Sequence, residues 1–433
     1  MSYLQTIAVV LAVLASLLGA LHALLTKRDP RSAFAWIAIC LMWPVLGVLI
    51  YLMFGKNRIL TRARRLHGEV GLDDHAAILR RNESAVLADG LDNYFLGQIR
   101  LGHAASMRPL LGGNQVELLI NGEQAYPAML AAIDRATHSV YLVSYIFDST
   151  KIGADFVSAL SRAVERGVEV RVLVDGVGRL YSIPRVTSKL RKAAVPHAVY
   201  LPPSLIPPTF TINLRNHRKI LVVDGECAFT GGMNIRQHHL VESASPRTRT
   251  EDIHFEIRGP VVGQLQDVFV ADWRFASKLS VAPRQPQQTD KQGDYCRVIT
   301  DGPNQDLEKL TRILMGALGV ARTSVCIMTP YFLPSRELQV ALQMAALRGV
   351  KVRVLMPQRN NMPFVKWAGF HIMDEMIAAG VEFYLYTGAF IHSKLFIVDR
   401  YYSVIGSSNL DQRSLRLNFE VAVETNGTLP APE

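Results

Sequence analysis

The chain has 433 residues, of which 49% are hydrophobic, and it carries a formal net charge of +10 at pH 7. This apolar fraction excludes an intrinsically disordered chain, and the length suffices for more than one domain. The positive charge indicates an acidic partner, for which the two candidates are a nucleic acid and an anionic membrane surface.

Two long apolar runs open the chain, at residues 4–25 and 33–54, and neither contains an Asp, Glu, Lys or Arg. Each is long enough to cross a hydrocarbon core of about 30 Å at about 1.5 Å per residue. The polar segment 26–32 between them includes Pro30, which suits a tight hairpin. A buried hairpin of a soluble protein and a cleaved signal peptide fit two such runs less well. We therefore predict that residues 1–55 hold two transmembrane helices.

A basic connector, residues 56–112, follows the second run. Its first part, residues 56–65, holds five Lys or Arg, against three in the segment 26–32. This bias favours a cytoplasmic main body attached to a membrane hairpin. The basic cluster also suits contact with anionic lipid headgroups, although an ordinary solvated flank has the same composition.

Strands and helices are predicted to alternate through the segment 113–282. Short apolar runs rich in β-branched residues indicate the strands, and 3.6-residue periodicity indicates the helices. This βαβα order is typical of an α/β lobe in which helices flank a sheet. The predicted strands are 116–120, 139–147 and 168–174, and the predicted helices are 125–136 and 154–166.

The segment 294–433 repeats this order. An Arg-Gly step at 166–167 leads from a helix into a strand, and the same step recurs at 348–349. The polar, proline-containing segment 283–293 has the composition of a linker. The fold class is therefore α/β, with two pseudo-symmetric lobes of mixed sheet and flanking helices. The predicted elements of the second lobe are helix 306–320, strand 324–329, helix 336–347 and strand 350–356.

One motif, H-x-K-x-x-x-x-D, occurs twice in the chain, at positions 175 residues apart. In both copies an asparagine lies 17 residues after the histidine. Four matched positions in two copies are far more specific than one His beside one Lys. We predict a single active centre built from both lobes. The first copy comprises His217, Lys219, Asp224 and Asn234, and the second comprises His392, Lys394, Asp399 and Asn409.

The chemistry of these residue types suits a phosphodiester. Two imidazoles can divide the roles of nucleophile and general acid or base. Lysine ammonium and asparagine amide groups can stabilise the phosphate oxygens, so neither a metal nor another cofactor is predicted. Asp224 and Asp399 fall at hairpin turns after short apolar strands, so we expect them to position the hairpins or pair with a cation.

The duplicated motif resembles that of the phospholipase D superfamily, from about residue 116 to the end of the chain. Residues 51–58, 329–334 and 406–420, together with the two apolar runs, are similar to bacterial cardiolipin synthases of the long, membrane-anchored type. The resemblance implies a multi-pass protein of the bacterial inner membrane that acts on phosphatidylglycerol and binds no nucleic acid.

The resemblance also implies a phosphatidyltransferase mechanism. His217 would attack one phosphatidylglycerol to form a phosphatidyl-histidine while His392 protonates the departing glycerol. His392 would then deprotonate a second phosphatidylglycerol, which attacks the intermediate to give cardiolipin. In the superfamily an acidic residue downstream of each motif orients its histidine, and Asp252 and Glu420 match those positions. The lysines and asparagines of the two motifs would hold the phosphate.

Three alternatives stay open. The first is a phospholipase D hydrolase, or a transferase that uses phosphatidylethanolamine or another alcohol. The second is a nuclease of the superfamily, and the third is an inactive membrane scaffold, against which two complete motifs argue.

Some other residues invite functional interpretation. The pair His238 and His239 is predicted to be exposed and polar, and His254 to be a structural strand residue. The proline-rich segment 202–208 is predicted to be a packed loop, with a lip against acyl chains as the alternative.

Overall fold

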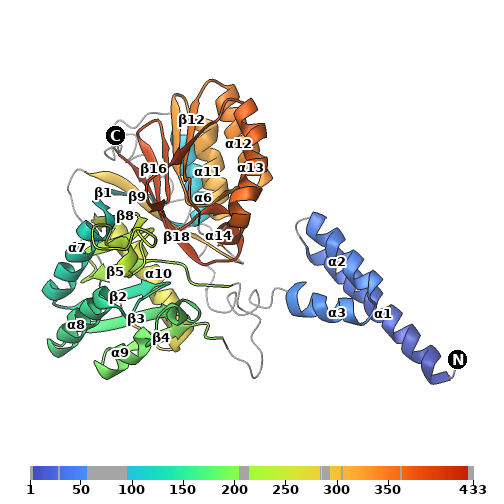
Figure 1. The fold of residues 1–433 in the computed structure, drawn as a ribbon, viewed down its shortest axis with the longest axis horizontal. Coiled ribbons are helices and arrows are strands. Elements are labelled where there is room, and N and C mark those ends of the chain that lie inside the picture. The colour runs from blue at the N-terminus through green and yellow to red at the C-terminus, as the bar shows by residue number, and fades with distance from the viewer. Residues whose placement is uncertain are drawn as a thin grey trace. The chain divides into compact units, whose positions relative to one another are not determined.

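The computed structural model describes residues 3–27, 30–55, 95–203, 214–282, 284, 293–303, 306–360 and 363–427. The chain divides into two compact units, one formed mainly by the amino-terminal residues 1–68 and one formed mainly by the remainder (Figure 1). Each is described by itself. Most of the predicted basic connector and of the predicted linker falls outside the described residues.

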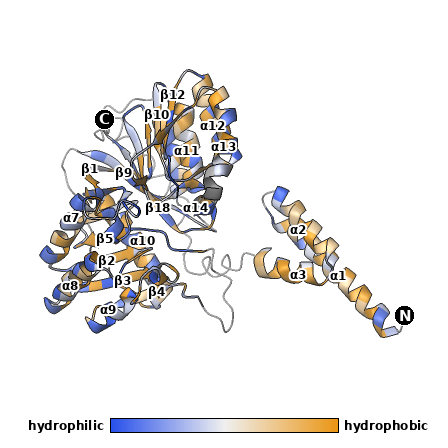
Figure 2. Ribbon diagram, in the orientation of Figure 1, coloured by the Kyte–Doolittle hydropathy of each residue, from blue (hydrophilic) through white to orange (hydrophobic). Residues whose placement is uncertain are grey.

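The amino-terminal unit consists of α1 (Tyr3–Thr26), α2 (Pro30–Met42), α3 (Leu46–Ile50) and the π-helical turn η1 (Tyr51–Gly55). Within the described residues, α1 is the one helix long and apolar enough to cross a membrane. Most of its residues are hydrophobic, as the orange colour of Figure 2 shows, and many of its large apolar side chains are exposed.

The second apolar run differs from the single helix predicted over 33–54. It is interrupted after Met42, and Pro44 lies in the interruption. Proline lacks an amide hydrogen, and its ring clashes with the carbonyl of the residue four positions earlier, so the helix cannot continue. Gly47 then passes close to α2, because a Cβ at this position would lie 2.0 Å from the carbonyl oxygen of Ile39. The apolar composition of this run correctly predicted helix, but Pro44 also interrupts the helix.

The main unit is built on one 14-stranded sheet that runs through both lobes. In the first lobe its strands are β1 (Leu111–Ile120), β2 (Ser139–Ser144), β3 (Glu169–Asp175), β4 (His197–Tyr200), β5 (Ile220–Val223), β6 (Cys227–Gly231) and β8 (Ile253–Arg258). In the second lobe they are β9 (Asp294–Asp301), β10 (Ser324–Met328), β12 (Lys351–Pro357), β13 (Glu382–Tyr386), β15 (Leu395–Val398), β16 (Tyr402–Gly406) and β18 (Glu420–Asn426).

The order of the strands shows the internal repeat. It reads β13-β12-β10-β15-β16-β18-β9 in the second lobe and continues as β1-β8-β6-β5-β2-β3-β4 in the first. Each strand therefore has a counterpart at the mirrored place, and β1 and β9 meet antiparallel at the centre. Both predicted βαβα patterns are confirmed, with the sheet parallel at β2 and β3 and at β10 and β12.

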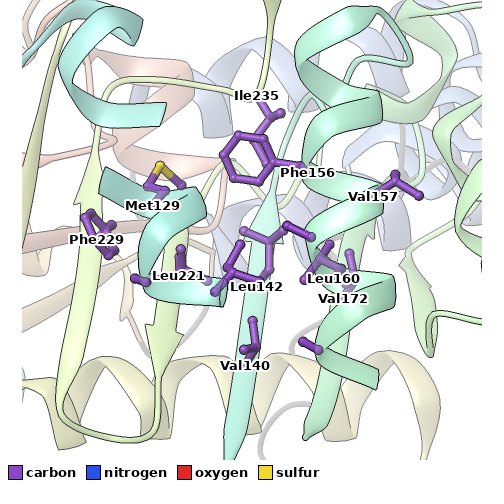
Figure 3. Close-up of a cluster of buried hydrophobic side chains, with 14 of the residues drawn as sticks. Met129, Val140, Leu142, Phe156, Val157, Leu160, Val172, Leu221, Phe229 and Ile235 are labelled. Carbon is purple, nitrogen blue, oxygen red and sulfur yellow. The ribbon is translucent and has the colours of Figure 1, made fainter. Parts of the chain in front are cut away.

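Helices cover the outer face of each half of the sheet (Figure 1). The apolar periodicity of each helix gives it one hydrophobic face, and this face packs on the sheet. Helix α8, for example, turns Phe156, Val157 and Leu160 towards Leu142 and Val172 of the sheet (Figure 3). Burial of such a side chain contributes about 1.5–3 kcal/mol. The first-lobe helices are α7 (Asn121–Arg135), α8 (Lys151–Glu165), α9 (Val186–Lys192) and α10 (Val261–Ser277). Those of the second are α11 (Lys309–Val320), α12 (Arg336–Leu347), α13 (Pro363–Ala378) and α14 (Gln412–Arg416).

One helix from the predicted connector belongs to the second lobe. Helix α6 (Leu96–Ser106) precedes the first lobe in sequence, yet its Gln98 amide donates to the Ile313 carbonyl oxygen at 3.0 Å and to the Tyr402 hydroxyl at 3.2 Å. Phe95 lies buried in the same core. The segment before residue 112 is therefore not only a connector. Its last part packs into the hydrophobic core of the second lobe, although the first lobe follows it directly in the sequence.

The inner faces of the two half-sheets differ. Helix α10 covers the inner face of the first lobe, and its Asp272 carboxylate accepts a hydrogen bond from the Arg218 guanidinium at 2.6 Å and one from the Asn216 amide at 2.7 Å. These contacts fix the residues on both sides of His217 to helix α10. The equivalent face of the second lobe borders a cavity of about 310 Å³, against which Leu355, Leu395 and Ile397 lie.

Candidate active site

The two histidines of the repeated motif are each held by an acid from the opposite lobe. The Nδ1 atom of His217 lies 3.0 Å from the Glu420 carboxylate, and the Nδ1 atom of His392 lies 2.9 Å from that of Asp252. Both acids are fully buried, whereas the histidine side chains keep 12% and 14% of their surface exposed. The two motifs therefore form one crosswise centre.

Backbone hydrogen bonds between the lobes place each histidine beside the acid of the opposite lobe. The amide of His217 donates to the carbonyl oxygen of Phe419 at 2.9 Å, next to Glu420. The amide of His392 donates to the carbonyl oxygen of Glu251 at 2.7 Å, next to Asp252, where β14 (Phe390–Ile391) pairs with β7 (Thr250–Glu251). Each histidine is thus aligned with an acid that lies far from it in sequence.

This finding corrects the expected pairing of each acid with the histidine of its own lobe. Asp252 and Glu420 do contact the histidines, but each contacts the histidine of the opposite motif. The reason is topological. Strand β7, which ends just before Asp252, pairs with β14, which leads into the second motif. Phe419, just before Glu420, pairs with Asn216, which lies just before the first motif.

Both histidines are held in the neutral form near pH 7. Burial, together with the charges of Lys219 and Lys394, lowers the pKa of His217 well below its ordinary value. Burial and the charge of Lys394 likewise lower the pKa of His392 to about 4. With Nδ1 facing a carboxylate, the other ring nitrogen, Nε2, is left to act on a substrate.

The two orienting acids differ in their own protonation. Burial raises the pKa of Glu420 to about 7, although Lys219 and hydrogen bonds from Ser407 and Asn418 oppose it. Burial would also raise the pKa of Asp252, but the hydrogen bond and charge of His392 and the charge of Lys394 bring it below its ordinary value. The pseudo-symmetric halves of the site are therefore chemically unequal.

The two motif lysines lie buried in the same centre. Lys219 donates to the carbonyl oxygen of His217 at 2.6 Å, and Lys394 donates to that of His392. Burial lowers the pKa of Lys219 to about 7 and that of Lys394 to about 8. An incoming phosphate would favour the charged form of both, since an opposite charge stabilises an ammonium group.

Hydrogen bonds hold the two motif asparagines in place. The side-chain oxygen of Asn234 accepts from the Ile146 amide at 3.1 Å, and the Asn409 amide donates to the Ser414 hydroxyl at 3.1 Å. Both side chains are buried, so their groups are fixed in place. Gly232, two residues before Asn234, has no room for a side chain, because a Cβ there would lie 2.3 Å from Asp252 Oδ1.

Two further residues at the site escaped the sequence analysis. The Tyr145 ring lies 4.9 Å from the His217 ring, and His239, only 3% exposed, lies 6.2 Å from the His392 ring. The expected exposure of His239 is thus wrong. It sits at the end of the 3₁₀ turn η5 (Gln237–His239), which turns it inwards, whereas the prediction assumed an extended segment. His254 lies on strand β8, as predicted.

Asp224 and Asp399 do not reach the histidines. The Asp224 carboxylate accepts from the amides of residues 137, 138 and 139 at 2.8–2.9 Å, and Asp399 accepts from those of 322, 323 and 324 at 2.7–2.9 Å. Each lies at the far end of the short strand that follows its motif. From the sequence we expected these aspartates to position the hairpins, and we propose that structural role for both.

Acid should destabilise the protein through the buried His254. Burial lowers its pKa to about 3, so between that value and about 6.5 the unfolded chain binds a proton that the folded chain does not. Stability is therefore lost as the pH falls below about 6.5, by about 2 kcal/mol at pH 5. Denaturant unfolding at pH 7.5 and pH 5 should show a smaller loss for His254→Leu than for the wild type or the exposed control His371→Leu. Equal losses in all three would contradict this account.

Known proteins share both the sequence and the fold of this chain. The family described as cardiolipin synthase, phospholipase D-like domain, matches residues 129–273 and 314–431, which include both motifs. The chain belongs to the cardiolipin synthase family of phospholipase D-like proteins. Residues 8–56 of this family member also match the phospholipase D-nuclease N-terminal family.

Several relatives resemble this cardiolipin synthase family member over nearly its full length. It is 35% identical to cardiolipin synthase A of Pseudomonas aeruginosa over 94% of its own length and 83% of the relative's, and 33% identical to a cardiolipin synthase of Geobacillus sp. over 92% and 80%. The crystal structure of phosphatidylserine synthase from Haemophilus influenzae covers 76% of the chain and 87% of its own, with a TM-score of 0.59 and 15% identity. That likeness confirms the fold.

Proposed function

We propose that the protein synthesises cardiolipin by transferring a phosphatidyl group from one phosphatidylglycerol to another. The observation that carries this proposal is the crosswise centre, in which two neutral histidines face two buried acids and two buried lysines. The family assignment supports the reaction class, and the geometry supports a double displacement.

In the first step Nε2 of His217 attacks the phosphorus of one phosphatidylglycerol. A bond forms between nitrogen and phosphorus, the bond to the glycerol oxygen breaks, and His392 gives its proton to that oxygen. The bound phosphodiester supplies the negative charge that raises the pKa of His392 and makes the imidazolium available. Glu420 stabilises the positive charge that develops on the His217 ring, as the buried carboxylate of a catalytic triad stabilises the imidazolium of its histidine.

In the second step His392 acts as a general base. It takes the proton from the primary hydroxyl of a second phosphatidylglycerol, whose oxygen attacks the phosphorus, and the bond to His217 breaks. Lys219 and Lys394 are placed to stabilise the non-bridging oxygens in both transition states. Asn234 and Asn409 are proposed to fix the phosphate, since each is buried and lies 17 residues after its motif histidine.

We propose that the protein resides in the bacterial inner membrane, passes through it more than once and carries its lobes on the cytoplasmic side. Support comes from the apolar α1, the second apolar segment and the basic residues after residue 55. Labelling of single cysteines placed in the segment 26–32 and in the main unit, in intact and in opened cells, tests the sidedness.

A lipid-product assay tests the reaction itself. Purified protein in mixed micelles receives phosphatidylglycerol alone and then phosphatidylglycerol with phosphatidylethanolamine. Cardiolipin with one equivalent of glycerol from phosphatidylglycerol alone is expected. Phosphatidic acid as the main product would make the protein a hydrolase, and cardiolipin formed only with phosphatidylethanolamine would reassign the donor.

Replacing Asp224 with Ala should affect stability far more than turnover. The variant loses a carboxylate that accepts three amide hydrogen bonds, which should lower the free energy of unfolding by about 1–3 kcal/mol. Cardiolipin formation per folded molecule should stay within about two-fold, because no contact joins this group to the histidines. Asp155→Ala, an exposed substitution on α8, is the control. A large loss of turnover with unchanged stability would restore Asp224 to the chemistry.

A further inference from the structure

A short segment of the first lobe exposes large apolar side chains beside the active site. Leu180, Tyr181 and Ile183 are 44%, 55% and 95% exposed, and they lie at or just after the 3₁₀ turn η3 (Gly178–Tyr181). Burying such groups would be favourable, so their exposure to water is costly. We call residues 180–183 the apolar rim.

The apolar rim is connected to the catalytic centre through aromatic contacts. The Tyr181 ring lies 6.2 Å from the Tyr145 ring, which in turn lies 4.9 Å from the His217 ring. The guanidinium of Arg236 lies 6.0 Å from the Tyr181 ring. The apolar rim therefore borders the place where the proposed phosphatidyl donor binds.

The charged residues in the segment that contains the apolar rim are all basic. The segment 178–192 contains five Lys or Arg and no Asp or Glu. Among these, Arg185, Arg191 and Lys192 are exposed. Apolar side chains in a segment whose charged residues are all cationic match an anionic lipid interface, in which the apolar groups enter the membrane and the cations meet the headgroups.

The second lobe has a comparable feature at the equivalent place. Helix α13 lies between β12 and β13, as η3 and α9 lie between β3 and β4, and these strands are counterparts in the sheet. It exposes Trp367 (64%) and Phe370 (38%). Because a pseudo-two-fold axis carries each lobe onto the other, equivalent segments lie at the same height along that axis, one on each side of the shared centre.

We propose that the apolar rim and the exposed aromatic residues of α13 enter the surface of an anionic phospholipid bilayer and hold the mouth of the active site against it. This inference rests on the proposed function, because it names how lipid substrates reach that site. Tyrosine and tryptophan favour the membrane interface, where one part of the side chain is apolar and the other meets water. A protein partner would not require two separate apolar segments at symmetric places beside a lipid-processing centre.

The test compares one substrate in two physical states. The full-length double variant Leu180→Ser/Ile183→Ser spares Tyr181 and its contacts. Its rate on phosphatidylglycerol in vesicles should fall about ten-fold, while its rate on a monomeric short-chain phosphatidylglycerol should stay within about two-fold of the wild type. Leu347→Ser, 73% exposed on α12, is the matched control and should leave both rates unchanged. Equal loss on both substrates, or no loss on vesicles, would overturn the proposal.

A second measurement tests the membrane contact of the apolar rim even if the protein makes no cardiolipin. A fluorophore on Ile183→Cys, in a Cys326→Ala background, should be quenched by nitroxide-labelled phosphatidylglycerol in proteoliposomes, and one on Leu347→Cys should not. Quenching without cardiolipin formation would support the membrane contact and refute the proposed function. Absence of quenching, with crosslinking of the same position to a second copy or another protein, would refute the membrane contact alone.

Discussion

Replacement of His217 or His392 by Ala should lower the rate of cardiolipin formation by about 10³-fold or more, because each variant removes one of two groups that act in sequence. The fold should survive, since both side chains are partly exposed and neither belongs to a hydrophobic core. The measurement is cardiolipin formation at saturating phosphatidylglycerol, with the melting temperature as a check on folding. The exposed His371→Ala is the control. Substantial activity in either active-site variant would rule out the two-histidine mechanism.

The two variants should nevertheless fail at different steps. A phosphatidyl ester of nitrophenol has a leaving group that departs without protonation, so it does not need His392 as an acid. His392→Ala should therefore release about one equivalent of nitrophenol per active site and then stop. His217→Ala should release none. The reverse pattern would exchange the roles of the two histidines.

Replacement of Asp252 by Asn should disable His392, although the two residues lie in different lobes. The carboxylate lies 2.9 Å from Nδ1 of His392 and carries the charge that an amide lacks. Loss of an orienting carboxylate lowers kcat by about 10²- to 10⁴-fold in comparable sites. We expect a loss of this order in cardiolipin formation, and Asp252→Asn should reproduce the nitrophenol release of His392→Ala.

Glu251→Gln provides the matched control for this prediction. It alters the neighbouring residue, whose carboxylate accepts from the Tyr386 hydroxyl at 2.8 Å, and leaves unchanged the Glu251 carbonyl oxygen that binds the His392 amide. Its rate should stay within about three-fold of the wild type. If Asp252→Asn instead matched His217→Ala, the crosswise pairing would be wrong.

The sequence predicted the repeat, and the repeat predicted much of the fold. Two βαβα patterns with a common Arg-Gly step led to two similar lobes, and these are the two halves of the sheet. The periodicity of residues 154–166 predicted helix α8, which starts three residues earlier, at Lys151, because a continuous apolar stripe is a strong helix signal. Local pattern was sufficient wherever neighbouring residues determine the structure.

Contacts between distant segments were not predictable in this way. Helix α6 gives no sign in the sequence that its Gln98 binds Tyr402, and nothing in the motif spacing reveals that Glu420 faces His217. Both depend on how the lobes meet at β1 and β9. A signal for the break in the second apolar run was present in Pro44, since a proline inside a helical pattern interrupts it.

The candidate site was predicted in its residues but not in all their roles. His217, His392 and the two lysines come together as expected, and Asp252 and Glu420 contact the histidines. The motif aspartates do not join them, because spacing alone does not show whether a motif carboxylate reaches the histidines or binds backbone amides at a turn. His239 was misplaced for a related reason, since a two-residue alternation does not hold in a 3₁₀ turn.

The most direct test of the central claim is to locate the covalent intermediate. His392→Ala is mixed with the nitrophenyl phosphatidyl ester, denatured at neutral pH, digested, and analysed by mass spectrometry. The account predicts a phosphatidyl adduct on the peptide that contains His217, and its loss in the His217→Ala/His392→Ala double variant. An adduct on another residue, or nitrophenol release with no adduct, would contradict a centre in which His217 attacks the phosphate.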